Sequence, residues 1–244
     1  MSDSPAPGSP PSIPVRERLI VALDVTSAEQ ARAMVRQLGD AVAFYKIGLE
    51  LLMADGFWDL TRWLGEQGKR VFADIKMYDV PETVRRAVEN LARHPVDFAT
   101  VHGNDAILQA AAGAKGHMQI LAVTVLTSLD QNDLGDMGLT GDPQQLVLSR
   151  AGRARQLGCD GVIASGLEAP LLRKTLGEGF LIVTPGIRPP ERRGADDQKR
   201  TVDVEEAFRG GADYIVMGRP IRDAADPRRT AEAVQARIQA IFSR

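Results

Sequence analysis

Three charged side chains gather at the end of one apolar stretch. Apolar residues 71–73 lead into Asp74 and Lys76, and Asp79 follows three positions after the lysine. Side chains two apart in a strand point to the same face, so we expect Asp74 and Lys76 to lie together, with Asp79 beyond them in a loop. A carboxylate beside an ammonium keeps the lysine charged and able to donate a proton. The alternative is a salt bridge at a strand end, because buried charges are costly unless they are paired or functional.

Two earlier apolar stretches also end in a charged residue. Asp24 follows the first stretch and Lys46 follows the second. If the three stretches are neighbouring parallel strands, two acids and two bases alternate along one rim of the sheet. Each lysine then lies near carboxylates that favour its charged form, whereas a Schiff-base lysine needs a depressed pKa. The arrangement therefore predicts proton donation.

A second group of residues has the composition of a phosphate site. Pro185-Gly186-Ile187-Arg188 and Gly218-Arg219 follow the last two predicted strands, and Gln198 lies between them. Glycine lets the backbone approach a ligand closely, and arginine offers a planar, bidentate cation. Because glycine turns with an arginine are common on surfaces, this group predicts a phosphate site only in combination with the rest of the chain.

Other polar residues carry weaker signals. The three histidines show no metal-ligand spacing; His94 is expected to be exposed, and only His102, at a strand end, is a candidate for the pocket. The basic pairs Arg192-Arg193 and Lys199-Arg200 are interpreted as a solvated loop. No Ser-His-Asp or Cys-His order stands out, so we predict no metal site and no covalent nucleophile.

An alternation of apolar strands and helices must position these groups. Predicted strands begin near residues 19, 43, 71, 96, 119, 161, 180 and 214, and a helical segment follows each one. This pattern is typical of a closed parallel (β/α)8 TIM barrel, whose sites lie at the C-terminal ends of its strands. The main rival is an open doubly wound sheet, but the G-x-G-x-x-G fingerprint of its dinucleotide-binding version is absent after the first strand.

Length and composition agree with one large domain. The chain has 244 residues and a formal charge of -2, so no global field favours nucleic acid or an anionic membrane. We interpret residues 1–14, rich in Ser and Pro, as a disordered leader and residues 15–244 as the catalytic barrel. The single cysteine, Cys159, has apolar neighbours and predicts a buried thiol in a reducing compartment. Without an apolar span or a secretory signal, the protein is expected to be cytoplasmic.

Several longer motifs, spread from about Arg18 onward, form a pattern particular to one family. They are Leu23-Asp24, Tyr45-Lys46-Ile47-Gly48, Asp74-Ile75-Lys76-Met77-Tyr78-Asp79-Val80-Pro81-Glu82-Thr83, Thr124-Val125-Leu126-Thr127-Ser128, Val183-Thr184-Pro185-Gly186-Ile187-Arg188-Pro189, Gln198 and Met217-Gly218-Arg219-Pro220. Together they resemble the bacterial orotidine 5′-phosphate decarboxylases, the family that catalyses the last step of UMP synthesis. The Met77-Tyr78 pair and Glu82 depart from the commoner Phe-His and Asn of that family.

The resemblance implies a role for each charged residue of the first group. Lys76 protonates the pyrimidine carbon as CO2 leaves, and Asp74 faces the departing carboxylate. Lys46 positions Asp74 and the ribose, while Asp24 binds a ribose hydroxyl. The protein then lowers the barrier by electrostatics alone, because the family uses no metal, flavin or nicotinamide cofactor.

The same resemblance implies a nucleotide substrate and a homodimer. Asp79 and Thr83 would reach the partner's site and Thr127 would meet the base. Three basic or glycine positions, Arg188, Gly218 and Arg219, would hold the phosphate, and Gln198 would bridge base and phosphate.

Two alternative functions stay open. The D-x-K-x-x-D pattern is shared with related sugar-phosphate enzymes, so a metal-dependent 3-keto-sugar-phosphate decarboxylase on the same barrel is one of them. The other is a catalytically silent nucleotide-phosphate binder. Inactivation by a chelator would favour the first, and binding of UMP without turnover would favour the second.

Overall fold

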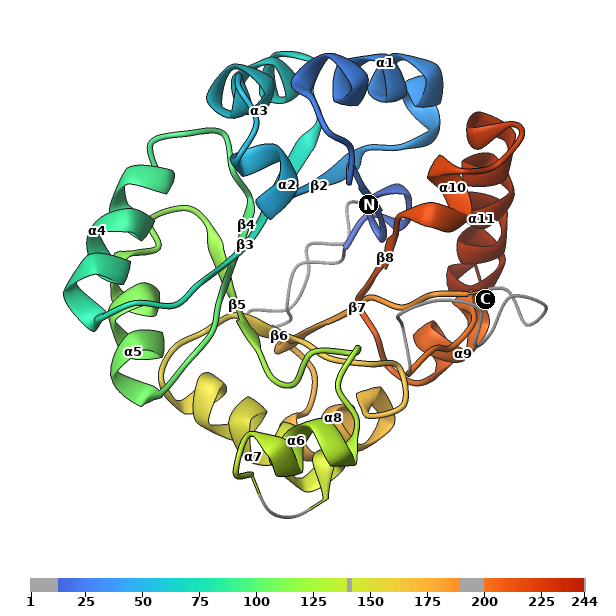
Figure 1. Cartoon of the computed structure of the whole chain (residues 1–244). Coiled ribbons are helices and arrows are strands. Elements are labelled where there is room, and N and C mark those ends of the chain that lie inside the picture. Colours follow the sequence, from blue (N-terminus) through green and yellow to red (C-terminus); the bar gives the residue numbers. More distant parts are fainter. Residues whose placement is uncertain (1–12, 140–141, 189–199, 244) are drawn as a thin grey trace, which may run out of the picture.

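Eight parallel strands close into a barrel in a computed structural model that describes residues 13–139, 142–188 and 200–243. The strands follow one another around the barrel in chain order, and β1 pairs with β8 to close it (Figure 1). The strands are β1 (Leu19–Ala22), β2 (Phe44–Gly48), β3 (Arg70–Met77), β4 (Phe98–Val101), β5 (Gln119–Val123), β6 (Gly161–Ile163), β7 (Leu181–Thr184) and β8 (Tyr214–Met217). The predicted (β/α)8 barrel is confirmed, and the open-sheet rival is wrong.

Helices surround the strands on the outside of the barrel (Figure 1). They are α1 (Ala28–Leu38), α2 (Leu49–Leu52), α3 (Phe57–Glu66), α4 (Pro81–Leu91), α5 (Asp105–Ala114), α6 (Gln131–Asp136), α7 (Pro143–Gln156), α8 (Ala169–Leu176), α9 (Val204–Arg209), α10 (Arg219–Arg222) and α11 (Pro227–Phe242), with short 3-10 turns η1 (Val15–Glu17) and η2 (Gly39–Ala41). The sequence did not predict the short helices α2, α6 and α10, which have four to six residues each. None of the helices described is long and apolar enough to cross a membrane.

Local signals fix where several helices begin and end. The Ser27 side chain accepts a hydrogen bond from the Gln30 amide and caps α1. Gly39 then ends that helix with a positive φ of 55°, a conformation that glycine adopts without steric cost. Pro81 occupies the first turn of α4, where its missing N–H costs nothing. The site residues at the strand ends are thus carried by elements with well-defined limits.

The barrel interior is filled by aromatic and aliphatic side chains. Phe44 and Phe98 meet edge to face with 5.0 Å between ring centroids, and Phe98 meets Tyr214 at 5.1 Å. Each fully buried phenylalanine of this kind stabilises the fold by about 1.5–3 kcal/mol. A larger apolar layer lies between the sheet and the helices. It includes Cys159, which is buried as predicted, and burial raises the pKa of its thiol to about 12.

Three aspartates fasten the N-terminal end of the barrel in the same way. Asp97, Asp160 and Asp213 stand directly before β4, β6 and β8. Each carboxylate accepts a hydrogen bond, 2.8 Å long, from the second backbone amide of the preceding strand, respectively Val71, Ile120 and Ile182. Each is also paired with a cation, respectively Arg70, Lys115 and Arg173. We call these contacts the aspartate clasps; they join β3 to β4, β5 to β6 and β7 to β8.

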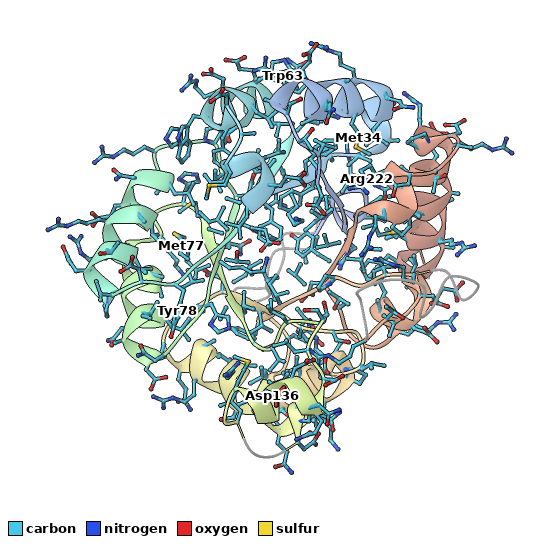
Figure 2. All side chains as sticks on the ribbon, in the orientation of Figure 1. Met34, Trp63, Met77, Tyr78, Asp136 and Arg222 are labelled. Carbon is cyan, nitrogen blue, oxygen red and sulfur yellow. The ribbon has the colours of Figure 1, made fainter. Side chains whose placement is uncertain are left out.

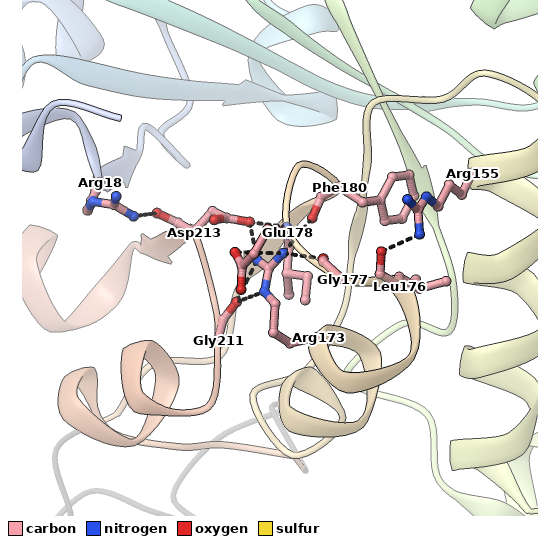
Figure 3. Close-up of polar contacts among 10 residues, drawn as sticks. Arg18, Arg155, Arg173, Leu176, Gly177, Glu178, Phe180, Gly211 and Asp213 are labelled. Carbon is pink, nitrogen blue, oxygen red and sulfur yellow. Dashed lines mark hydrogen bonds and ion pairs between the residues drawn. The ribbon is translucent and has the colours of Figure 1, made fainter. Parts of the chain in front are cut away.

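Arg173 makes the most extensive of these clasps (Figure 3). Its guanidinium donates to Asp213 Oδ2 at 2.6 Å, to the carbonyl oxygens of Gly177 and Gly211 at 2.8 Å, and to that of Phe180 at 3.1 Å. One side chain of α8 therefore ties together the segments that lead into β7 and β8. Because this network lies at the end of the barrel opposite the strand C-termini, we expect it to serve stability.

We predict that Arg173→Ala lowers the free energy of unfolding by about 3–5 kcal/mol, because it leaves a largely buried carboxylate without its cation. Urea unfolding measures the loss. The control is Arg237→Ala, an exposed position on α11, which should change stability by less than about 0.5 kcal/mol. Equal stability of the two variants would contradict a structural role for the Arg173 network.

Candidate active site

The end of β3 departs from regular strand geometry. Its pairing with β4 shifts register between Ala73 and Met77. Inside this bulge Lys76 has a φ of +47°, and among the described residues it is the only one other than glycine with a positive φ. Such a backbone conformation costs of order 1–3 kcal/mol and is typical of functional sites. The Lys76 amide is held there by a hydrogen bond of 2.9 Å to the Thr100 hydroxyl oxygen.

Asp74 lies at the centre of a charged cluster. Its Oδ1 is 2.9 Å from Lys76 Nζ, and its Oδ2 is 3.6 Å from Lys46 Nζ. Lys46 Nζ also donates to Asp24 Oδ1 at 2.9 Å. The Thr100 hydroxyl donates to Asp74 Oδ1, again at 2.9 Å. The structure therefore brings together the two acids and two bases that the sequence predicts at the ends of the first three strands.

Burial and charge act in opposite directions on this cluster. Burial disfavours the charged form of Lys46, but the carboxylates of Asp74 and Asp24 outweigh it and raise the lysine pKa. Burial likewise opposes ionisation of Asp74, but Lys46 and Lys76 outweigh it and lower the pKa of that carboxyl. Lys46 and Asp74 are thus both held ionised at neutral pH.

The depressed pKa of Asp74 predicts how the stability of the protein responds to pH. Because the folded pKa of Asp74 is depressed, its contribution to stability is complete above the unfolded value of about 3.9 and is lost as pH falls through the folded pKa. The difference in unfolding free energy between the wild type and Asp74→Asn should therefore be constant from about pH 5 to 7 and shrink in stronger acid. Urea unfolding of both proteins across this range measures it. A difference that stays the same into acid would contradict the assigned ionisation.

A cavity opens at the C-terminal end of the barrel above this cluster. Phe72, Ile163 and Val216 contribute apolar wall. The predicted site residues that line the cavity are Asp24, Lys46, Asp74, Lys76, Thr127, Arg188, Gly218 and Arg219, together with Pro185 and Gly186. The charged cluster and the predicted phosphate residues therefore share one cavity.

The predicted phosphate residues follow β7 and β8 in the chain. Arg188 is buried, and its backbone amide donates to the Val202 carbonyl at 2.9 Å. Gly186 has a positive φ of 75°, which favours glycine. A Cβ at Gly218 would lie 3.4 Å from both Ala22 Cβ and Asp24 Oδ2, so the end of β8 closely approaches Asp24. Gln198, Arg192, Arg193 and Lys199 lie outside the described residues.

Two predicted residues lie away from this cavity. Asp79 and Thr83 are exposed, the first in the loop after β3 and the second in the first turn of α4. Exposed Tyr78 and Val80 flank Asp79. Figure 2 shows Met77 and Tyr78 on the side of the barrel that carries α4 and α5, and Arg222 across the barrel at α10. The loop that carries Asp79 thus presents polar and apolar groups to the outside of the chain.

Sequence reasoning missed two residues that support the cluster. Thr100 is fully buried in β4 and bonds both Asp74 and the Lys76 backbone. Arg222 donates from α10 to the backbone oxygen of Asp24 at 2.6 Å. A polar residue in the middle of an otherwise apolar strand was the available signal for Thr100. No pattern marked Arg222, because it follows the phosphate motif within an unpredicted short helix.

The histidines lie elsewhere. His102 is outside the cavity, in a separate depression beside Tyr78, whose ring it meets edge to face at 5.6 Å. Burial, and then the charges of Arg150 and Lys76, lower the pKa of His102. The expectation that His94 is exposed is wrong, since it is partly buried and stacks on Trp58 at 4.3 Å. In the part of the chain that the structure describes, no group of three His, Cys, Asp or Glu residues is arranged to hold a metal ion.

Comparisons with known proteins place this arrangement in context. A sequence model of the orotidine 5′-phosphate decarboxylase / HUMPS family matches residues 17–234. The chain is 60% identical to an orotidine 5′-phosphate decarboxylase of Methylococcus capsulatus, over 95% of this chain and 96% of the relative. It is 51% identical to one of Xanthomonas axonopodis pv. citri, over 98% and 97%.

Solved structures agree with the sequence comparisons. A crystal structure of orotidine 5′-phosphate decarboxylase from Lactobacillus acidophilus superposes with a TM-score of 0.81 at 35% identity, covering 91% of this chain and 99% of the other. One from Pyrococcus horikoshii gives a TM-score of 0.73 at 27% identity, with the same coverage. The similarity thus extends over the whole barrel.

Proposed function

This chain belongs to the orotidine 5′-phosphate decarboxylase / HUMPS family, and on that premise we propose that it converts orotidine 5′-phosphate to UMP and CO2 with Lys76 as the proton donor. Its curated relatives are decarboxylases, so the chain is a carbon–carbon lyase. The observation that carries the proposal is the position of Lys76 in one cavity with two phosphate-binding candidates, Arg188 and Arg219.

The proposed reaction moves one electron pair and one proton. The bond between the pyrimidine ring and its carboxylate breaks, CO2 leaves, and the electron pair stays on the ring carbon. The ammonium of Lys76 donates a proton to that carbon and is reprotonated from water. Because the charge of Lys76 is in place before the bond breaks, it stabilises the developing carbanion without reorganisation.

The other members of the cluster hold this ammonium in place. Asp74 accepts from Lys76 Nζ and would face the substrate carboxylate, whose negative charge is relieved only when CO2 departs. Lys46 would orient Asp74 and contact the ribose, and Asp24 would accept from a ribose hydroxyl. The proposal needs no metal or organic cofactor, because the ammonium supplies the positive charge.

The phosphate would bind at the far side of the cavity. Arg188 and Arg219 offer charged donors, and Gly186 and Gly218 allow the backbone to approach the phosphate oxygens. Thr127 would contact the pyrimidine, and Gln198 is proposed to bridge base and phosphate. Binding energy gained at the phosphate can be used to orient the reacting ring over Lys76.

We also propose that the active form is a homodimer. Asp79 and Thr83 are exposed and lie away from the cavity of their own chain, so they are available to a partner. The apolar side chains of Tyr78 and Val80 beside them, 70% and 63% exposed, would be covered in such a dimer. Each site would then contain Lys76 from one subunit and Asp79 from the other.

Incubation of orotidine 5′-phosphate with the purified protein tests the reaction directly, because the absorbance of the orotate ring is lost as UMP forms. The expected result is turnover that continues in excess chelator. Turnover abolished by the chelator and restored by a divalent metal would favour the metal-dependent sugar-phosphate decarboxylase. Tight binding of UMP with no turnover would favour the silent binder.

A further inference from the structure

Arg200 and Glu168 form a buried ion pair beside the cavity. Arg200 Nη1 donates to Glu168 Oε1, and the two side chains are 12% and 6% exposed. The prediction that Arg200 belongs to a solvated loop is therefore wrong, because its side chain is largely buried. The sequence did not indicate this burial, since the acidic partner lies far away along the chain. Burial raises the pKa of Glu168, and its other oxygen has no hydrogen-bond partner among the described residues. Stability alone is a weak reason for such a pair, since desolvation offsets the attraction.

The free end of the guanidinium reaches the cavity wall. Arg200 Nη2 donates to the backbone oxygens of Val125 and Leu126, at 3.1 Å and 3.0 Å. These two residues follow β5 and directly precede Thr127, and all three line the cavity. Arg200 therefore holds the backbone that presents Thr127.

Arg200 is itself attached to the phosphate side of the cavity. Val202, two residues later, forms a parallel bridge with Ile187, and its carbonyl accepts from the Arg188 amide at 2.9 Å. The hydroxyl of Ser165 donates to the Arg200 carbonyl at 3.4 Å. The short segment 200–202 is thus fixed at both its backbone and its side chain.

We propose that Arg200, held by Glu168, is a positioning residue for the pyrimidine: it fixes residues 125–127 so that Thr127 meets the base. This inference rests on the proposed function and deepens it. It identifies Arg200 as a residue that holds segment 125–127, which would face the base, without contacting the substrate itself. A charge-assisted bond to each of two successive carbonyls restricts that backbone before the nucleotide arrives.

Binding of two ligands to Arg200→Ala tests the proposal. UMP carries the base, whereas ribose 5-phosphate does not. The dissociation constant of UMP should rise roughly tenfold and that of ribose 5-phosphate should stay within about twofold of the wild type. The KM for orotidine 5′-phosphate should rise by the same factor as the dissociation constant of UMP. The kcat should change little, since the lost contact stabilises the bound substrate and the transition state equally.

Further variants separate positioning from folding. Arg200→Lys keeps a cation and should recover part of the UMP affinity. The double variant Glu168→Gln/Arg200→Gln leaves no buried unpaired charge. The same two dissociation constants can be measured on it if Arg200→Ala does not fold. Arg173→Ala is the matched control, because that arginine is 15% exposed in a buried pair at the other end of the barrel. It should lose stability without changing the ratio of the two dissociation constants.

Two results would overturn the inference. One is an unchanged affinity for UMP in both Arg200→Ala and the double variant. The other is an equal loss of affinity for both ligands, which would assign Arg200 to the phosphate. Failure of the wild type to decarboxylate would reject the proposed function separately, because ligand binding is measured without turnover.

Discussion

Replacing Lys76 by alanine is expected to lower kcat by more than about a thousandfold while UMP binds nearly as well as to the wild type. The ammonium is proposed both to stabilise the carbanion and to donate the proton, and UMP, the product, needs neither action. Asp74 stays paired with Lys46 in this variant, so the charged cluster is not left uncompensated. Stopped assays of orotidine 5′-phosphate consumption and calorimetric titration with UMP measure the two quantities.

Lys69→Ala is the control for this experiment. Lys69 donates to the Gly39 and Val42 carbonyls, away from the cavity, so its loss removes a lysine without touching the cluster. We expect kcat to remain within about twofold of the wild type. Near-normal turnover in Lys76→Ala would remove that lysine from the reaction and, with it, the proposed mechanism.

Mixing two inactive variants is expected to restore activity. Asp79→Ala and Lys76→Ala each damage both sites of a homodimer. In a hybrid dimer, one site combines the intact Lys76 of the first variant with the intact Asp79 of the second. Random exchange of equal amounts makes about half of the dimers hybrids with one whole site of two, so activity should reach about a quarter of the wild type.

A second mixture provides the matched control. Asp79 and Thr83 lie on the same exposed segment, so they would reach the same partner site. Mixing Asp79→Ala with Thr83→Ala creates no undamaged site and should give no gain over the separate variants. If Asp79→Ala and Lys76→Ala exchange subunits, as native mass spectrometry would show, and activity does not return, the shared site is excluded.

The charged cluster could be predicted from the sequence because composition marks strand ends. Asp24, Lys46 and Asp74 each appear at or near the end of a short apolar run, and a closed parallel barrel puts all such ends on one rim. Arg188 and Arg219, the predicted phosphate ligands, also follow strand ends. Strand order and chain order coincide in this barrel, so neighbours along the sequence pattern are also neighbours in space.

The remaining features depend on contacts that no local pattern records. A positive φ is ordinarily assigned to glycine, so nothing in the sequence indicates it at Lys76. Arg200 appeared to be one charge among several, since its burial depends on Glu168, 32 residues earlier. The roles of Asp79 and Thr83 remain predictions, because they concern a second subunit.

The aspartate clasps have a consequence for dividing the chain. They join strands in pairs, and a cut between β4 and α5 separates no clasp, whereas a cut between β5 and β6 parts Asp160 from the Ile120 amide and from Lys115. Two co-expressed half-barrels divided at the first point should therefore reassemble more readily than halves divided at the second. The contacts at the N-terminal end of the barrel thus divide into separate units, whereas the cavity at the C-terminal end is lined by residues of both halves.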